Sequence, residues 1–258
     1  MSTPAPPRPH RRAATQLLVG LLPLLVTGAV LCVVLAVRLS AALEPLAAAT
    51  GTVTATVVAV RTAEDLLFGL AATVLAVVVA AVVTGLRVVV RRRLRRAPAS
   101  AAIATRVVVR QGLVVRSWLE VATGRGVRWL PVHWSPELAA LQPDTRIEFR
   151  GDVATGRTAL PVIDGAEVWP SGRLRTRTPR GERRVVVPAD LPDAPVTWSR
   201  QVRSDVLITL AAPVLGLLWA FVDGSGTAGF VVATVLAAAL LFWLAELLGS
   251  DPSPPPRD

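Results

Sequence analysis

The sequence predicts an integral membrane α-helical protein with four transmembrane helices and an inserted small all-β cytoplasmic domain, an SH3-like or OB-like barrel. The first observation behind this is composition: 52% of the 258 residues are hydrophobic, yet the formal net charge is +10. An apolar and strongly basic chain is typical of membrane proteins. The second is distribution, because the apolar residues form four uncharged runs around one mixed central stretch.

The four runs have about the length that a helix needs to cross a bilayer. We expect transmembrane helices over residues 17–37, 66–86, 206–222 and 228–248. A span requires roughly 17–25 apolar residues, and only a helix satisfies its own backbone groups in lipid. The first run is longer than the core of a signal peptide, and Arg38 stands where a cleavage site has small neutral residues. It is therefore expected to be an uncleaved anchor.

The distribution of arginine predicts the orientation. All 28 basic residues are arginine, and six of them directly follow the second run: Arg87, Arg91, Arg92, Arg93, Arg95 and Arg96. The loop at 38–65 has few basic residues, and the loop at 223–227 has none. The positive-inside rule then places both termini and the central domain in the cytoplasm, with the chain as a multi-pass protein of the cytoplasmic (inner) membrane. The six arginines are expected to anchor this topology and to contact anionic lipid headgroups.

The segments between the spans are assigned from composition. We expect a basic cytoplasmic tail at 1–16, an extracytoplasmic loop at 38–65, an arginine-rich juxtamembrane linker at 87–102, the β-barrel domain at 103–188, a linker at 189–205, a short outer loop at 223–227 and a disordered tail at 249–258. Within the loop at 38–65, Ala-rich stretches favour helical extensions with a break near Gly51.

Short-range patterns predict the strands of the central domain. Residues 145–150 alternate Arg146, Glu148 and Arg150 with Ile147 and Phe149, the pattern of a half-buried strand. Asp164-Gly165 is typical of a hairpin turn. Ser135-Pro136-Glu137 favours the start of a short helix, because serine caps well and proline suits the first helical position.

The residues that carry most enzyme chemistry are scarce. One cysteine excludes a disulfide scaffold, and two histidines, His10 and His133, leave little for a metal site. His133 has no carboxylate at a recognisable spacing, and no nucleotide-binding or zinc motif is present. We therefore expect no catalytic, metal-binding or cofactor-binding residue and no cofactor. A membrane-bound enzyme centred on His133 and a nearby carboxylate stays an alternative.

A second arginine-rich stretch is the candidate partner contact. Arg173, Arg175 and Arg177 follow Trp169, and tryptophan and arginine are enriched at interface hot spots. The simpler interpretation is a solvated loop lying on the membrane. Trp118, Trp129 and Trp134 are further contact candidates, although such rings also fill small cores. Nucleic acid is not expected as a partner, because only aliphatic residues surround the arginines at 87–96.

Three stretches carry a resemblance to a known group of proteins. They are Trp129-Leu-Pro-Val-His-Trp-Ser-Pro-Glu-Leu, Thr145-Arg-Ile-Glu-Phe-Arg-Gly-Asp and Val168-Trp-Pro-Ser-Gly-Arg. They resemble the central segment of uncharacterised actinobacterial multi-pass membrane proteins. The resemblance implies two helices, a small cytoplasmic β domain and two more helices, and it implies no catalytic residues.

Two functions are compatible with these observations. The first is a non-enzymatic membrane protein whose β domain mediates protein–protein interaction or assembly, with another membrane or cytoplasmic protein or with further copies of itself. The second is an accessory subunit of a membrane transporter or channel, in which the helices form a wall rather than a pathway. The spans place no ionisable side chain at mid-bilayer, as a transporter acting alone would be expected to do.

Overall fold

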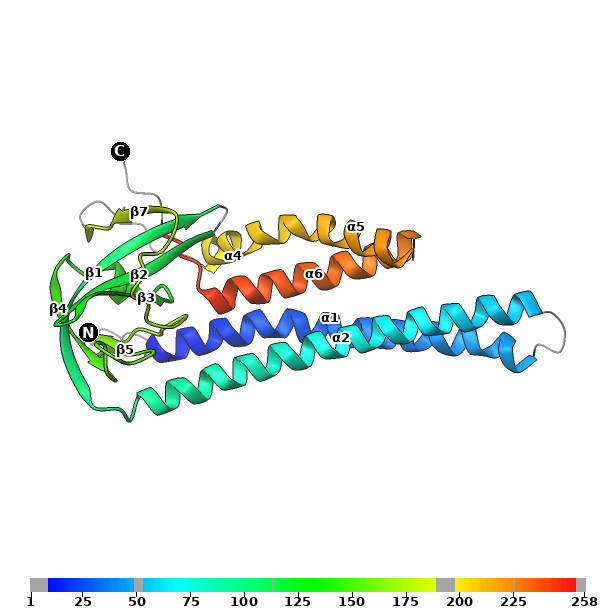
Figure 1. Cartoon of the computed structure of the whole chain (residues 1–258), viewed down its shortest axis with the longest axis horizontal. Helices are drawn as coiled ribbons and strands as arrows, with labels where there is room; N and C mark the ends of the chain where they lie inside the picture. Colours follow the sequence, from blue (N-terminus) through cyan, green and yellow to red (C-terminus); the bar gives the residue numbers. More distant parts are fainter. Residues whose placement is uncertain (1–8, 49–52, 113, 189–197, 225, 254–258) are drawn as a thin grey trace, which may run out of the picture. The chain divides into compact units, whose positions relative to one another are not determined.

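The computed structural model describes residues 9–48, 53–112, 114–188, 198–224 and 226–253 (Figure 1). The chain divides into two compact units. The helical unit comprises Gly20–Val83 and Thr209–Trp243, and the sheet unit comprises Met1–Val19, Thr84–Ile208 and Leu244–Asp258. The end of the second helix and the end of the last helix thus belong to the sheet unit.

The described helices range in length from 4 to 42 residues. They are α1 (Pro9–Ala48), α2 (Val53–Leu94), α3 (Pro136–Ala139), α4 (Trp198–Val206), the 3-10 segment η2 (Leu207–Ala211), α5 (Ala212–Asp223) and α6 (Gly226–Leu248). Four segments are long and apolar enough to cross a membrane: Leu21–Ala41, Leu66–Leu94, Val202–Val222 and Gly229–Leu248. This agrees with the prediction of a multi-pass membrane protein.

Several segments predicted as tail, loop or linker are helical instead. α1 already includes residues 9–16, α1 and α2 extend through residues 38–48 and 53–65, and α2 continues to Leu94. The extensions around the predicted loop agree with the Ala-rich composition there, and the expected break at Gly51 lies outside the described residues. Arginine is a good helix former, so the charge at 87–94 does not end α2.

The third span starts before its apolar run and contains a break. Residues 198–206, predicted as linker up to 205, form α4, and η2 separates α4 from α5. Pro213 stands at the start of α5 and has no N–H to donate to the carbonyl four residues earlier. Proline is tolerated in the first turn of a helix, so the chain begins a new helix there.

Within the helical unit, neighbouring helices approach closely at glycines. An added Cβ at Gly28 of α1 would lie 2.5 Å from Val77 of α2. At Gly216 of α5 it would lie 2.0 Å from the Thr234 hydroxyl of α6 and 3.0 Å from the Thr234 Cα. Small residues let helix backbones pack together where lipid supplies no hydrophobic driving force.

The central domain is one antiparallel sheet. Its strands are β1 (Ala99–Gln111), β2 (Val114–Thr123), β3 (Gly126–Val132), β4 (Thr145–Arg150), β5 (Leu160–Ile163), β6 (Ala166–Glu167) and β7 (Glu182–Val185). The strand order is β3-β2-β1-β4-β5-β6, and β7 also pairs with β1. The long central β1 therefore has three neighbours: β2 on one side, with β4 and β7 along successive parts of its length.

The prediction of an SH3-like or OB-like barrel is wrong in one respect, because the sheet is not closed. Among the described strands, β3 and β6 end the order without pairing with each other. Two isolated bridges cover β3 instead, Trp129 with Arg175 and Val132 with Pro170. Pro131 in β3 and Pro170 opposite have no N–H to donate, which limits a continuous ladder between these segments.

The local predictions for the sheet are confirmed. Ile147 and Phe149 of β4 are buried in the core, whereas Arg146 and Glu148 are exposed. Asp164 and Gly165 turn between β5 and β6 with positive φ angles of 48° and 77°, as a tight hairpin turn requires. The Ser135 hydroxyl accepts a 3.2 Å hydrogen bond from the Leu138 N–H and caps α3.

The glycine contact between α5 and α6 makes a first prediction. Gly216→Val places a branched side chain against the Thr234 backbone, and overpacking of this kind costs about 1–3 kcal/mol. We expect the thermal unfolding midpoint of the full chain in detergent to fall by about 5 °C. Gly85→Val is the matched control, because a Cβ at Gly85 meets nothing within 4 Å. Equal effects of the two variants would contradict close packing at Gly216.

Candidate functional site

Three arginines at the end of α2 and directly after it contact other parts of the sheet unit. Arg87 and Arg91 are four residues apart and lie on one side of α2, and Arg95 follows its last residue, with its N–H donating to the Arg91 carbonyl at 3.1 Å. Arg87 Nη1 donates to the Ser171 carbonyl at 2.8 Å and to the Leu247 carbonyl at the end of α6. Arg95 Nε donates to Glu167 at 2.7 Å. Half of the predicted lipid anchors thus contact protein, while Arg92, Arg93 and Arg96 are exposed.

Arg91 also determines the protonation state of His133, the residue directly after β3. Arg91 Nη2 lies 3.0 Å from His133 Nε2. A guanidinium only donates, so Nε2 must accept, and the ring is neutral with its proton on Nδ1. Complete burial and the charges of Arg91 and Arg87 hold the pKa of His133 well below its usual value. Its hydrogen bond to an arginine rather than a carboxylate gives it no acidic partner for general-base chemistry at this nitrogen.

Trp169 lies under two of the three arginines. The guanidinium of Arg91 stands 4.1 Å from the Trp169 ring centroid, and that of Arg95 stands 5.7 Å away. A cation over an indole face at these distances is attractive. Trp169, predicted as a candidate partner contact, is only 7% exposed, and its ring packs against Arg91 and Arg95 of the same chain. Trp118 and Trp129 are also buried, which confirms the core interpretation for both.

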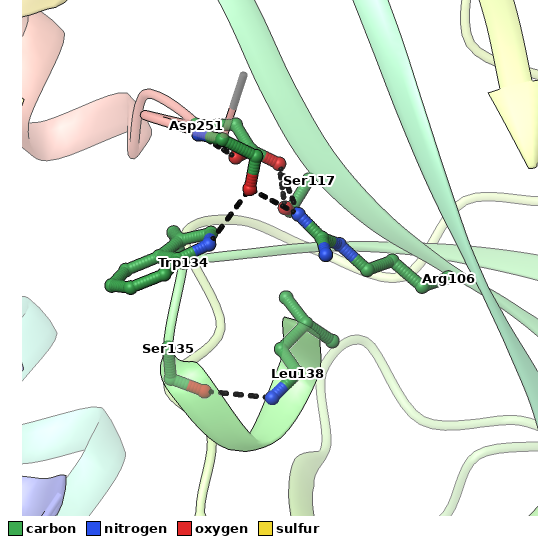
Figure 2. A network of polar contacts seen from close by, with 7 residues as sticks. Arg106, Ser117, Trp134, Ser135, Leu138 and Asp251 are labelled. Atoms are coloured by element: carbon green, nitrogen blue, oxygen red, sulfur yellow. Dashed lines mark hydrogen bonds and ion pairs between the residues drawn. The ribbon is translucent and has the colours of Figure 1, made fainter. Parts of the chain in front are cut away.

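The chain beyond α6 enters the sheet unit. Arg106 at the centre of β1 and Asp251 form an ion pair with 2.9 Å between Nη2 and Oδ2, and both side chains are fully buried. Figure 2 shows Arg106 and Ser117 meeting the Asp251 side chain, with the Ser117 hydroxyl donating to Oδ2. The Asp251 N–H donates to the Val115 carbonyl of β2 at 2.8 Å. The prediction of a disordered tail is therefore wrong for residues 249–253.

Asp251 is ionised in this site. Burial alone raises the pKa of a carboxyl group. At Asp251 the charge of Arg106 and hydrogen bonds from Ser117 and Ser253 outweigh burial and lower its pKa below the usual value. Ser253 also receives hydrogen bonds from Arg106 and from Trp134 Nε1, at 2.8 and 2.9 Å. The segment 251–253 thus supplies the acceptors that β1, β2 and Trp134 need.

A pair of carboxyl groups is buried beside this segment. Asp205 of α4 is fully buried and Glu246 of α6 is 2% exposed. The Ser250 hydroxyl donates to the Asp205 carboxylate, and the Ser204 and Ser250 hydroxyls are 3.1 Å apart. Asp205 comes close to Glu246 because residues 198–206, predicted as linker up to residue 205, fold into α4.

The second arginine-rich stretch is exposed and firmly held. Arg173, Arg175 and Arg177 are exposed, whereas Leu174 between them is buried. Arg175 and Trp129 exchange two backbone hydrogen bonds of 2.8 and 2.9 Å. Farther along, Gln111 Nε2 donates to the Arg180 carbonyl at 2.6 Å and β7 pairs with β1. We define residues 173–184 as the arginine surface.

Within the described ranges, no group of three or more His, Cys, Asp or Glu side chains is arranged to hold a metal ion. The ends of α2 and α6 instead meet the sheet through arginine, histidine and tryptophan side chains, together with the carboxylates of Glu167 and Asp251. The chemistry of these contacts is the recognition and neutralisation of charge.

The buried ion pair makes a second prediction. Asp251→Asn leaves the Arg106 charge buried without a counter-ion, which costs about 3–5 kcal/mol. Urea unfolding of the full chain in detergent, followed by tryptophan fluorescence, should show this loss. Glu148→Gln is the control, because Glu148 is exposed and 3.8 Å from Arg150, where a surface pair contributes under about 1 kcal/mol. Equal stability of the two variants would argue against a structural role for the pair.

His133 makes a third prediction, on pH. Because its pKa is lowered in the folded state, the unfolded state binds more protons below its ordinary pKa of about 6.5, and stability falls there. Between pH 7.5 and 5.5 one such histidine contributes a loss of about 1.4 kcal/mol. In His133→Gln the side-chain carbonyl can still accept a hydrogen bond from Arg91. In the same unfolding experiment, the stability of this variant should fall by about 1.4 kcal/mol less than that of the wild type between pH 7.5 and 5.5. An unchanged pH dependence in the variant would contradict a buried neutral histidine.

No family model, no curated protein and no solved structure matches this chain. The resemblance to actinobacterial membrane proteins therefore stays a prediction, and the function has to be argued from the site itself.

Proposed function

We propose that the chain is a non-enzymatic integral protein of the cytoplasmic (inner) membrane whose β domain, on the cytoplasmic side, docks an acidic protein and holds it at the membrane. The observation that carries this proposal is the arginine surface. It presents Arg173, Arg175 and Arg177 to solvent on a segment whose backbone is already ordered. A preordered surface loses little conformational freedom on binding.

The charges of this surface support an acidic partner. In the described part of the chain none of these three arginines pairs with a carboxylate, because the ion pairs there involve Arg95, Arg106 and Arg150. Arginine forks bind carboxylates in a bidentate manner and are enriched at interface hot spots. Exposed positive charge also raises the association rate with an acidic protein.

The orientation rests on the exposed arginines at the end of α2. Arg92, Arg93 and Arg96 are exposed, which leaves them accessible to anionic headgroups at the cytoplasmic leaflet. This arrangement supports cytoplasmic N- and C-termini and a β domain close to the membrane surface.

A photo-crosslinking amino acid at position 177 tests the docking proposal. We expect one discrete protein adduct in intact cells, and charge reversal of Arg173 and Arg175 to Glu should reduce it by about tenfold or more. The same cross-linker at Arg146, also exposed but on β4, serves as the control with the same two reversals. The proposal would be contradicted if no adduct forms at position 177, or if the yield of the adduct does not change when Arg173 and Arg175 are replaced by Glu. An adduct of twice the chain mass would identify the partner as a second copy.

The buried carboxyl pair favours a second candidate, an accessory subunit of a transporter or channel. Ionisable groups at the ends of spans are costly, and they commonly mark ion or proton pathways. Asp205 and Glu246 stand at such ends. A cross-linker at Leu217, a 63% exposed side chain of α5, discriminates the two candidates. A polytopic membrane protein captured from position 217, with no adduct from 177, would favour the accessory subunit.

A further inference from the structure

Three buried N–H donors near the end of α2 have no acceptor. Arg91 Nη1, Arg116 Nε and Trp169 Nε1 are shielded from solvent and make no hydrogen bond within the described residues. Arg91 is 3% exposed and stacks over the Trp169 ring, so two of the three donors are close neighbours. Buried polar groups without partners are rare and costly, and several at one place call for a ligand, an ion or water.

Four arginines lie near these donors. Arg87 interacts electrostatically with Arg116, and Arg91 interacts with Arg87. Burial, together with the neighbouring charge of Arg175, lowers the pKa of Arg116. None of the four arginines forms an ion pair with a carboxylate among the described residues. We name Arg87, Arg91, Arg116 and Arg175 the arginine cluster.

The Arg91 guanidinium is held at one of its terminal nitrogens and unpartnered at the other. Nη2 is held by His133 and by the Pro170 carbonyl, whereas Nη1 has no partner. Arg87 is likewise held in place, by the carbonyls of Ser171 and Leu247. The guanidinium groups are thus oriented before any ligand arrives.

The donor set defines the ligand chemistry. Arginine and indole N–H groups only donate, so the ligand must bring acceptors and negative charge. A phosphate group offers several acceptor oxygens around one centre, and arginine forks match them. A single carboxylate offers two oxygens in one plane, which is fewer than the donors of four arginines require.

The position of the cluster indicates where the phosphate comes from. Arg87 and Arg91 lie in the last turns of the apolar span Leu66–Leu94, the depth at which headgroup phosphates lie when α2 crosses a bilayer. We propose that the arginine cluster and Trp169 bind the phosphate of an anionic phospholipid, so that the lipid links α2 to β2 and the arginine surface. This inference rests on the membrane placement proposed above and shares Arg175 with the arginine surface, so its test varies Arg116, which lies outside that surface.

Lipid binding to the purified full chain in detergent tests the proposal. We expect phosphatidylglycerol to remain bound in native mass spectrometry at one molecule per chain and to raise the thermal unfolding midpoint, with phosphatidylcholine much weaker. Arg116→Gln should weaken phosphatidylglycerol binding about tenfold, the effect of losing one charge-assisted hydrogen bond. Arg92→Gln removes the same charge from an exposed position of α2 and should change binding by less than about twofold.

Each alternative outcome overturns the proposal. Equal weakening by Arg116→Gln and Arg92→Gln would indicate general attraction to basic residues rather than a site. Stabilisation by inorganic phosphate without stabilisation by lipid would assign the cluster to a soluble phosphate compound. Equal binding of phosphatidylcholine would remove the requirement for negative charge. Because Arg91 also holds His133, Arg116 is the position tested, and its variant must unfold at the wild-type midpoint without lipid. Loss of the chain from the membrane fraction would instead contradict the membrane placement.

Discussion

The buried ion pair between Arg106 and Asp251 is the interaction on which the sheet unit depends. Two fully buried charges are tolerated only when they are paired and their remaining donors and acceptors are largely satisfied. Arg106 stands on β1, the strand that pairs with β2, β4 and β7, and Asp251 stands three residues beyond the end of α6. The pair therefore fastens the end of the last helix to the centre of the sheet. Ser117 donates a hydrogen bond to Asp251, Ser253 accepts one from Arg106, and both serines help to keep the aspartate ionised.

The arginines of α2 fasten a second helix end to the same sheet. Arg91 contacts His133 and Trp169, and Arg87 reaches the final turn of α6. Charged groups at a membrane exit generally serve topology and lipid contact. Here one side of α2 directs its arginines into the protein while the other side leaves them exposed. This division explains how one basic run supports both an ordered domain and, as we propose, a lipid phosphate. The ordered domain in turn presents the arginine surface in a fixed conformation.

Features with a local cause were predicted from the sequence. Long apolar runs indicated the spans, alternation indicated the burial of Ile147 and Phe149, and Asp164-Gly165 indicated a tight turn. The features that were missed depend on residues far apart in the chain. Arg91 and His133 are 42 positions apart, and Arg106 and Asp251 are 145 apart, so no spacing rule connects them. The proline-rich composition of the C-terminal segment is typical of disorder. Part of the segment is ordered because the buried charge of Arg106 needs Asp251 as its counter-ion. A closed barrel would require the edge strands β3 and β6 to pair with each other. Prolines limit such pairing, and the alternation of apolar and polar residues along a strand does not show which strands become neighbours.

Hydrogen exchange at the amide of Asp251 tests most directly whether the segment after α6 is part of the sheet. That N–H donates to the Val115 carbonyl beside a fully buried ion pair, and amides in such positions exchange only through unfolding of the surrounding structure. We expect the Asp251 amide of the full chain in detergent to exchange as slowly as the paired amides of β1 and β2. Exchange at the rate of an unstructured peptide, while β1 and β2 remain protected, would contradict it.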